Sequence, residues 1–362
     1  MSSFGSIIHI NLFGESHGPS VGVVINNLPA GLTLDHNQIQ NALLKRRPKS
    51  SLSTSRQEKD PYQIISGYFN KKTTGAPLTI LIPNSDTRSK DYNPNILRPS
   101  HSDYTAKVKY NNFNDYRGGG HFSGRLTAPL VVLGAICEQI LESKGILVAS
   151  HIASIKDQKD VKFSLDNLNP NTMKTLISSD FPLLNTEIKE QFEEEILNAK
   201  SQQDSVGGTI ETAILGISAG YGDPFFEKVE SLLAHLMFSI PAVKGLSFGD
   251  GFDITSKYGS EVNDPFILEN GQIKTLTNHS GGIQGGITNG MPIVFTTAIK
   301  PTSSIGKPQQ TVNVETMEEV TFTLEGRHDP AIVHRAIHVI NAMTCYAVVE
   351  LISRTEGTKW ML

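Results

Sequence analysis

Two apolar runs near the start of the chain predict a pair of short strands. The first run spans residues 7–12 and the second spans residues 21–25. The stretch between them, residues 14–18, reads GESHG. Its glycines predict a loop between the two strands.

A helix is predicted to begin at Asp35, which forms a capping-box-like pair with Gln38, and to end before Pro48. Further strands are predicted at residues 64–68 and 78–82. A long polar segment from residue 84 to residue 120 then separates these strands from the next helix, and loops of this length are usually functional or disordered.

Three apolar stretches predict the helices of the core. The first begins near Thr127 and ends at Gly145. Residues 226–240 and 330–352 are apolar around most of their circumference, which is typical of helices buried on several sides, so sheets should cover them. Residues 185–200 predict an amphipathic surface helix instead, with most of its glutamates on the outer face.

The order of these elements predicts the fold class. Strands and helices alternate without the regular spacing of a doubly wound sheet, which indicates an α+β fold in layers. No linker divides the chain, so residues 1–362 are expected to form one domain. Glycine-rich stretches at 118–120 and 281–286, each near an apolar helix, hint at an internal duplication.

Composition limits the classes of partner. The chain has 362 residues, 38% of them apolar, and a formal net charge of −4, so no general basic surface is expected to bind nucleic acid or an anionic membrane. Cys137 and Cys345 lie in apolar helical stretches and predict no disulfide. Neither a signal peptide nor a membrane span is apparent, so we expect a cytoplasmic protein.

The sequence GESHG also fits the G-x-S-x-G pattern of serine hydrolases. That motif requires a helix directly after the serine, whereas Gly18 and Pro19 lead here into a strand-like run. We therefore expect a ligand-binding loop. Within it, the imidazole of His17 is suited to transfer protons near neutral pH, and the alternative is an ordinary structural histidine.

The polar segment 84–120 contains a second candidate acid, His101, which lies between Arg98 and Asp103. A structural loop residue is again the alternative. Three successive glycines, 118–120, indicate positive φ angles or a close backbone approach, and backbone N–H groups before a helix suit an anion. Neither this stretch nor 281–286 matches the dinucleotide fingerprint, so no Rossmann domain is expected.

Two segments near the C-terminus supply polar groups. Residues 300–304 contain one lysine and three hydroxyls, a donor set suited to a phosphomonoester, although polar turns of this composition are common. Asp329 and Pro330 are expected to be the N-cap and first residue of the last helix, which leaves Arg327 and His328 without a structural explanation.

Further cations close the first predicted helix at residues 45–47, where they complement its macrodipole. His334 and His338 share a helix face, but no third ligand of suitable spacing accompanies them. No metal site is expected.

Taken together and in order, these motifs resemble the chorismate synthase family along essentially the whole chain. They are GESHG, the basic helix end, RPSHSDYT, DYRGGG, SIPAVKG, NHSGGIQGG, KPTSSI and GRHDP. The resemblance implies core helices between two antiparallel sheets and a homotetramer. It also implies a lyase that eliminates phosphate and the C6 proton from 5-enolpyruvylshikimate 3-phosphate, requiring reduced FMN without net redox change. NADPH is a possible reductant for the flavin.

The resemblance also assigns roles to individual residues. His17 and His101 match the histidines that protonate the departing phosphate and the reduced flavin, and Asp329 matches the aspartate that helps to remove the C6 proton. The implied FMN contacts are His121, Phe122, Ser123, Pro241, Ala242, Gly285, Lys300, Pro301, Thr302, Ser303, Ser304 and Arg327. The implied substrate contacts are Ser16, Arg46 and Arg125, with Arg327 beside them.

Three positions depart from the common family pattern. His121 stands in place of an arginine, Leu52 in place of another arginine and Pro241 in place of an asparagine. A titratable histidine at the flavin would weaken FMN binding as pH rises. Two other classes of function remain open at this point, a flavin-dependent oxidoreductase and a non-catalytic flavin- or nucleotide-binding protein.

Overall fold

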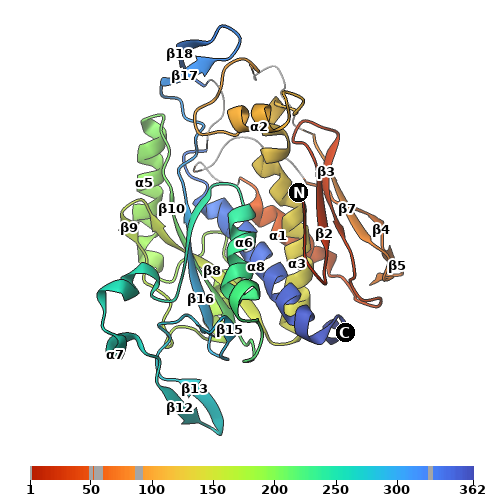
Figure 1. Cartoon of the computed structure of the whole chain (residues 1–362), viewed down its shortest axis with the longest axis vertical. Helices are drawn as coiled ribbons and strands as arrows, with labels where there is room; N and C mark the ends of the chain where they lie inside the picture. The colour runs from red at the N-terminus through yellow and green to blue at the C-terminus, as the bar shows by residue number, and fades with distance from the viewer. Residues whose placement is uncertain (1, 49–51, 53–59, 86–92, 325–328) are drawn as a thin grey trace.

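The computed structural model describes residues 2–48, 52, 60–85, 93–324 and 329–362. Two five-stranded antiparallel sheets enclose a layer of helices (Figure 1). The first sheet has the order β1-β2-β3-β7-β4, formed by Ser3–Phe4, Ile10–Gly14, Ser20–Ile25, Leu78–Pro83 and Gln63–Ser66. The second has the order β11-β16-β10-β8-β9, formed by Val243–Phe248, Ile293–Ile299, Gly208–Leu215, Leu147–Ile155 and Gln158–Lys159.

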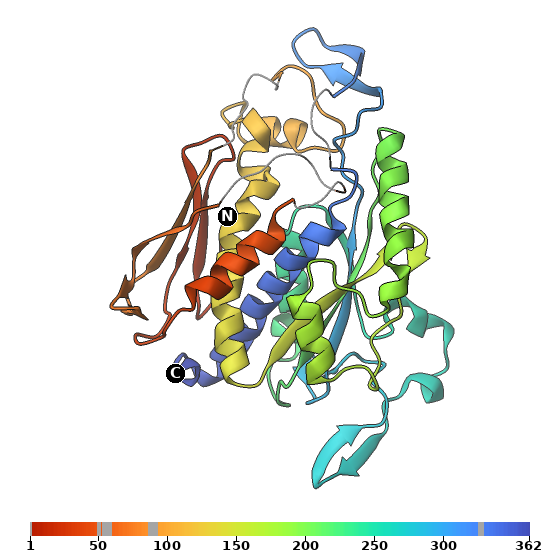
Figure 2. The ribbon, with the colours of Figure 1, turned by 180° about the vertical axis from the view of Figure 1, so that it is seen from behind.

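Three of the helices between the sheets are apolar around most of their circumference, as burial there requires: α3 (Thr127–Ser143), α6 (Val229–Ser239) and α8 (Val333–Glu356). The fourth, α1 (His36–Arg46), is amphipathic; it buries Ile39, Leu43 and Arg46 and packs against α3 and α8. On the outer face of the second sheet, α4 (Pro170–Ser178) packs Met173 and Leu176 against Ala149 and Ala213. The amphipathic α5 (Lys189–Ser201) lies beside this sheet (Figure 2).

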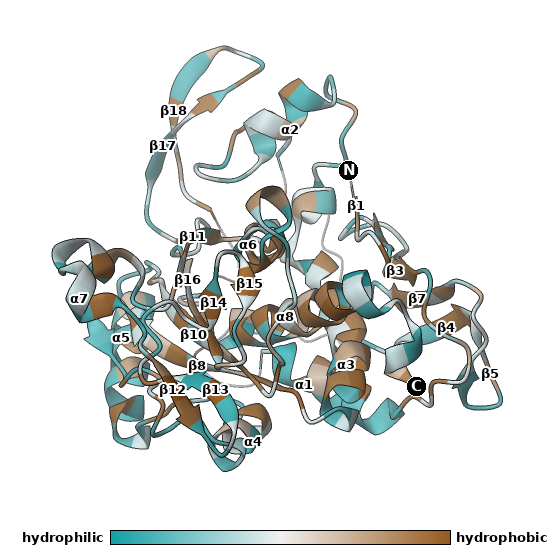
Figure 3. Ribbon diagram, turned by 60° about the horizontal axis from the view of Figure 1, so that its bottom comes forward, coloured by the Kyte–Doolittle hydropathy of each residue, from teal (hydrophilic) through white to brown (hydrophobic). Residues whose placement is uncertain are grey.

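Short elements decorate this sandwich. Two short helices are α2 (Asp103–Lys109) and α7 (Gly259–Val262), and 3₁₀ turns include η2 (Arg117–Phe122) and η3 (Gly124–Leu126). Four hairpins complete the chain: β5–β6 (Tyr68–Phe69, Lys72–Thr73), β12–β13 (Phe266–Glu269, Gln272–Thr275), β14–β15 (Ile283–Gln284, Ile287–Thr288) and β17–β18 (Gln309–Asn313, Glu318–Phe322). In Figure 3, apolar colour concentrates on the central helices and also on the projecting β12–β13 hairpin.

Chain order indicates an internal duplication, although the glycine-rich stretches that hinted at one are not equivalent: 118–120 precedes α3 and 281–286 precedes β16. The first half runs β2, β3, α1, β4, β7, α3, and the second half runs β8, β10, α6, β11, β16, α8 apart from inserted elements. The matching strands have the same spatial order, β2-β3-β7-β4 and β8-β10-β16-β11. The two final helices, α3 and α8, pack on each other so closely that a Cβ on Gly134 would lie 2.2 Å from the Cβ of Ala342.

Several expectations need correction. The polar segment 84–120 contains helix α2 as well as loop. The last helix begins at Val333 with Ile332 as its N-cap, so Asp329 is not the cap and lies four residues before the helix. The structure also contains two helices long and apolar enough to cross a membrane, at 124–143 and 333–356, but their apolar windows are 78% and 89% buried in this fold. That burial is typical of core helices.

Candidate functional site

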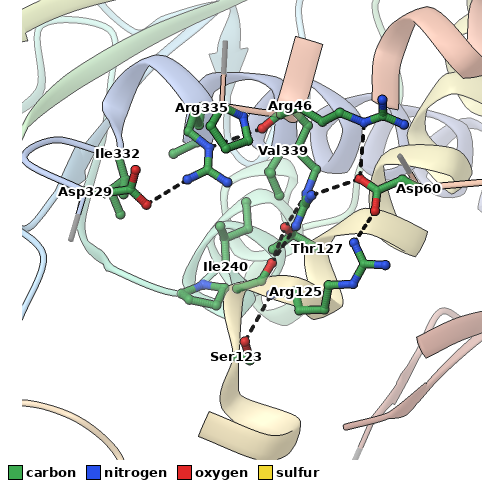
Figure 4. Close-up of a pocket in the computed structure, with 15 residues that line it drawn as sticks. Arg46, Asp60, Ser123, Arg125, Thr127, Ile240, Asp329, Ile332, Arg335 and Val339 are labelled. Atoms are coloured by element: carbon green, nitrogen blue, oxygen red, sulfur yellow. Dashed lines mark hydrogen bonds and ion pairs between the residues drawn. The ribbon is translucent and has the colours of Figure 1, made fainter. Parts of the chain in front are cut away.

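A cavity of about 270 Å³ lies where α1 ends and α8 begins (Figure 4). Segments from both halves of the chain line it. Its charged lining residues are four arginines and two aspartates, an excess of two positive charges: Arg46, Arg47, Arg125, Arg335, Asp60 and Asp329. The remaining lining residues are Pro48, Ser123, Gly124, Thr127, Ile240, Pro241, Ile332, Ala336 and Val339. This charge balance suits a small ligand with several negative charges.

Asp60 organises three of these arginines. Its carboxylate is 1% exposed, forms a close ion pair with Nη1 of Arg125, and lies 3.6 Å from nitrogens of both Arg46 and Arg47. Nε and Nη2 of Arg47 are buried and make no hydrogen bond to any residue that the structure describes. Buried cationic donors are costly unless an acceptor reaches them, so these two atoms fit an anionic ligand in the cavity.

Other polar groups fix the directions of the guanidinium groups. Arg46 donates from Nε to Oγ1 of Thr127 at 2.9 Å and from Nη2 to the carbonyl of Gly124 at 3.0 Å. Arg125 donates from Nε to Oδ1 of Asn84 at 2.9 Å and from Nη2 to the carbonyl of Pro83 at 3.0 Å. Both predicted substrate arginines are therefore buried, held and directed at one cavity.

Asp329 lies on the opposite wall of the cavity. Its Oδ2 accepts a hydrogen bond from Nη1 of Arg335 at 2.8 Å, and Nε of Arg335 donates to the carbonyl of Arg46 at 3.3 Å. Oγ1 of Thr302 donates to the backbone carbonyl of Asp329 at 2.7 Å. These contacts join the start of α8 to the end of α1 and to the 300–304 segment.

The 300–304 segment meets the loop that carries His101. Nζ of Lys300 donates to Oγ of Ser303 at 2.9 Å and to the carbonyl of Ser100 at 3.2 Å, while the Lys300 N–H donates to the carbonyl of Ala242 at 3.0 Å. Ser100 and Ala242 both adopt positive φ angles, 58° and 73°. Left-handed conformations of non-glycine residues cluster at functional sites, where the surroundings hold them in place.

His101 bridges the same two segments. Its Nε2 lies 2.9 Å from Oγ of Ser304, and its Nδ1 lies 3.0 Å from the carbonyl of Pro99, so Nδ1 carries the proton that this carbonyl accepts. Burial and the nearby cations Arg98 and Lys300 hold the pKa of His101 below its ordinary value. This shift favours the neutral imidazole.

The glycine stretch shapes the environment of His17. All three of its residues, 118–120, have positive φ angles, as expected from the sequence. A Cβ on Gly118 would lie 2.5 Å from Nε2 of His17 and 2.7 Å from Oγ of Ser16, so only glycine allows this approach. Oγ of Ser16 donates to the carbonyl of Gly118 at 2.9 Å. His17 and Ser16 are both buried.

One carbonyl connects this region to the cavity. The Gly120 oxygen accepts from the Ser16 N–H at 3.1 Å and from the Ser123 N–H at 3.4 Å, and Ser123 lines the cavity. His121 uses its ring differently, because Nδ1 lies 2.8 Å from the carbonyl of Gly14 and Nε2 lies 2.7 Å from Oγ of Ser2. Its ring ties the N-terminal segment to the GESHG loop.

The remaining predicted FMN contacts do not all reach the cavity. Pro241 lines it. Phe122 is half exposed and packs near Tyr110, and Pro301 lies within the 300–304 segment. Gly285 lies in the β14–β15 turn at the other end of α6, whose eleven residues span about 16 Å, so one chain does not bring it to the cavity. Arg327 lies outside the described residues.

Among the residues that the structure describes, no group of three or more His, Cys, Asp or Glu side chains is placed to hold a metal ion. Leu52 is buried in the main hydrophobic core.

Sequence reasoning missed several polar residues of the site, among them Asp60, Asn84 and Arg335. Arg335 carried a usable signal, because a cation in the first turn of an otherwise apolar helix opposes both the packing and the macrodipole. Asp60 and Asn84 carried none, since their partners lie 65 and 41 residues away at Arg125.

The fold and site define an enzyme of the α+β class with an arginine-walled cavity for a polyanionic small molecule. The sequence profile of the family described as "Chorismate synthase" matches residues 8–352. The chain therefore belongs to the chorismate synthase family. As a member of this family, it is a carbon–oxygen lyase of the shikimate pathway.

Relatives and a solved structure agree with this assignment. The chain is 42% identical to a chorismate synthase of Pyrococcus abyssi over 349 residues, which cover 96% of both chains. It is 45% identical to one of Lachnoclostridium phytofermentans over 364 residues, which cover 99% of this chain and 96% of the relative. A structure titled "Crystal Structure of Chorismate Synthase" superposes with a TM-score of 0.78 at 27% identity, and covers 99% of this chain and 95% of its own.

Proposed function

We propose that this chain converts 5-enolpyruvylshikimate 3-phosphate into chorismate by a 1,4-elimination that uses reduced FMN without net redox change. The observation that carries the proposal is the cavity in which four arginines outnumber two aspartates, with the carboxylate of Asp329 on one wall. The substrate has a phosphate and two carboxylates. A leaving phosphate requires charge neutralisation as its C–O bond breaks, which these arginines supply.

The elimination balances with the groups present. The C6–H bond breaks and its electron pair forms a C1–C6 double bond, the C1–C2 pair moves to C2–C3, and the C3–O bond breaks with its pair leaving on phosphate. Asp329 accepts the C6 proton. His17, buried beside the glycine stretch, donates a proton to the departing phosphate.

The residues present fit FMN. Lys300 and the hydroxyls of 302–304 provide an ammonium and three donors for a phosphomonoester, and they lie beside Ala242 and His101. Bound reduced FMN would supply transient electron density that weakens the C–O bond. His101 would hold a proton on the flavin side of the site, and an anionic ligand there would favour its charged form.

Anaerobic phosphate release tests the proposal. Reduced FMN and the enolpyruvyl substrate should yield one phosphate and one chorismate per turnover, with catalytic flavin and no stoichiometric consumption of NAD(P)H. Consumption of NAD(P)H in proportion to product would indicate an oxidoreductase. FMN binding without phosphate release would indicate a binding protein. NADPH oxidation by the chain with free FMN would show whether it reduces its own flavin.

We also propose that the chain assembles as a homotetramer in the cytoplasm. The β12–β13 hairpin supports self-association, because Phe266, Leu268 and Ile273 share one face and are 67%, 77% and 73% exposed. An ion pair between Lys274 and Glu269 lies on the other face. A two-stranded hairpin is marginal alone, so a second copy is the expected cover for its apolar face. Analytical ultracentrifugation tests the tetramer: a monomeric wild type, or a Leu268→Lys variant that remains a tetramer, would contradict this mode of assembly. Cell fractionation tests the cytoplasmic location.

A further inference from the structure

Asn84 joins the two sides of the site that the proposed function uses separately. It directly follows β7, whose last residue, Pro83, pairs with Ser20 at the start of β3. Because the two strands are antiparallel, the residue after β7 lies beside the loop before β3. The Asn84 N–H donates to the carbonyl of Pro19 at 3.1 Å and continues this pairing by one residue.

The Asn84 amide group holds a turn that contains His17. The Gly18 N–H donates to the carbonyl of Glu15 at 3.1 Å, which places Ser16 and His17 at the two central positions of a four-residue turn. Nδ2 of Asn84 donates to the carbonyl of Glu15 at 2.9 Å and to the carbonyl of Gly18 at 2.8 Å. Both ends of the turn are therefore attached to a single side chain.

The other atom of the same amide holds Arg125. Oδ1 of Asn84 accepts a hydrogen bond from Nε of Arg125 at 2.9 Å. The two terminal nitrogens of Arg125 donate instead to the carboxylate of Asp60 and to the carbonyl of Pro83. The partners settle the orientation of the amide, since guanidinium can only donate and the two carbonyls can only accept. No other standard side chain of this size presents both functions in this geometry.

We propose that Asn84 is a positioning residue that sets the distance and orientation between His17, the proton donor to the departing phosphate, and Arg125, the guanidinium that binds the anionic substrate. This inference rests on the proposed function for the roles of those two residues. Both must act on the same phosphorylated substrate, and misplacement by about 1 Å can cost up to about 10²-fold in rate.

Two variants separate the donor and acceptor functions of the amide. Asn84→Asp keeps an acceptor for Arg125 but cannot donate to the turn, whereas Asn84→Ala loses both. We expect kcat to fall roughly 10–10²-fold in both variants. KM for the substrate should stay within about threefold in Asn84→Asp and rise further in Asn84→Ala, because only the latter removes the acceptor of Nε of Arg125. Asn26→Ala is a matched control, since its amide donates to the carbonyl of His9 at 3.2 Å outside the site.

A double-variant cycle tests whether Asn84 acts through His17. Once His17→Ala has removed the proton donor, adding Asn84→Ala should lower kcat by less than threefold. A wild-type kcat in Asn84→Asp, or fully multiplicative losses in the double variant, would overturn the inference.

Amide hydrogen exchange provides a measurement that does not depend on turnover. The peptide covering residues 14–19 should exchange faster in both Asn84 variants than in wild type and Asn26→Ala, with melting temperatures recorded alongside. Unchanged exchange in Asn84→Asp would overturn the inference even if wild type proves unable to release phosphate. That last result would contradict the proposed function instead.

Discussion

Nε2 of His101 lies 2.9 Å from Oγ of Ser304, although 203 residues separate the two in the chain. This contact attaches a loop of the first half to the lysine- and hydroxyl-rich segment of the second half. The family resemblance assigns His101 to protonation of the reduced flavin and residues 300–304 to FMN binding, and this contact places the two segments side by side.

Replacing either candidate proton donor should remove most of the activity. We expect His17→Ala and His101→Ala each to fold and bind FMN but to lose about 10²–10⁴-fold in kcat, the usual contribution of general acid catalysis. Anaerobic phosphate release measures the loss. His36→Ala is a control, because His36 bonds the hydroxyls of Tyr62 and Tyr68 instead. Near-normal turnover in one variant would exclude that histidine from the mechanism.

Lys300→Ala should weaken FMN binding more than it weakens the fold. A hydrogen bond to a charged group contributes about 1.5–3 kcal/mol, so we expect roughly a 10–100-fold rise in Kd. Flavin fluorescence titration gives Kd, and thermal unfolding of the flavin-free protein gives the effect on stability. Lys156→Ala removes an exposed lysine paired with Glu195 and should leave both unchanged. An unchanged Kd in Lys300→Ala would reject this role.

Asp60→Ala should make the fold depend on anions. Removing one partner of a buried ion pair costs about 3–5 kcal/mol, because the guanidinium groups of Arg46, Arg47 and Arg125 then lack their shared carboxylate. Inorganic phosphate can replace that charge. The melting temperature should therefore rise more steeply with phosphate concentration in the variant than in wild type. An equal rise in both proteins would show that Asp60 does not neutralise these arginines.

His151 should make stability depend on pH. Burial alone would lower its pKa, but hydrogen bonds to Asp160 and Glu211 outweigh burial and raise it. The stabilisation from His151 is then complete below its unfolded pKa of about 6.5 and is lost as pH rises through the folded pKa. The pKa of Asp160 is lowered despite its burial, through bonds from His151 and backbone N–H groups, so its share is lost in acid.

Chemical unfolding should accordingly show a larger difference in free energy between wild type and His151→Gln at pH 6 than at pH 9. A difference that stays constant, or that grows with pH, would show that His151 is not charged in the folded protein.

Gly134→Val should destabilise the helix core without altering the cavity. Its branched side chain would collide with Ala342 across the α3–α8 contact, and overpacking typically costs about 1–3 kcal/mol. Denaturant unfolding measures the cost. Gly124→Ala is not a suitable control because Gly124 lines the cavity, but Gly259→Ala meets nothing within 4 Å and should have little effect.

The sequence predicted elements well where the signal is local. Helix α1 begins after Asp35, whose carboxylate accepts from the N–H groups of Asn37 and Gln38, so the predicted N-cap is confirmed. The reciprocal half of the predicted pair with Gln38 was wrong, because the Asp35 N–H donates to Oε1 of Gln139 instead. The prediction that Asp329 is the N-cap of the last helix was wrong, because Pro330 is equally compatible with a turn before the helix. The ion pair between Asp329 and Arg335 holds that turn in place.

Within the site, residue types were predictable and long-range partners were not. His101 and the 300–304 segment stood out by composition, yet nothing local marks their contact. Asn84 and Asp60 were missed for the same reason, since an amide or carboxylate in a polar stretch acquires its role only when strands distant in the chain pair beside it.

The matched order of strands and helices in the two halves has a consequence for the origin of the cavity. Arg46 and Arg125 come from the first half, whereas Pro241, Asp329 and Arg335 come from the second. Each half by itself would form one sheet covered by helices on one face, with the far side of those helices exposed to solvent. Such a half would supply only part of the cavity lining. A polypeptide of half this length would have needed to pair with a copy of itself before such a chamber existed, along the seam that Gly134 and Ala342 now close within a single chain.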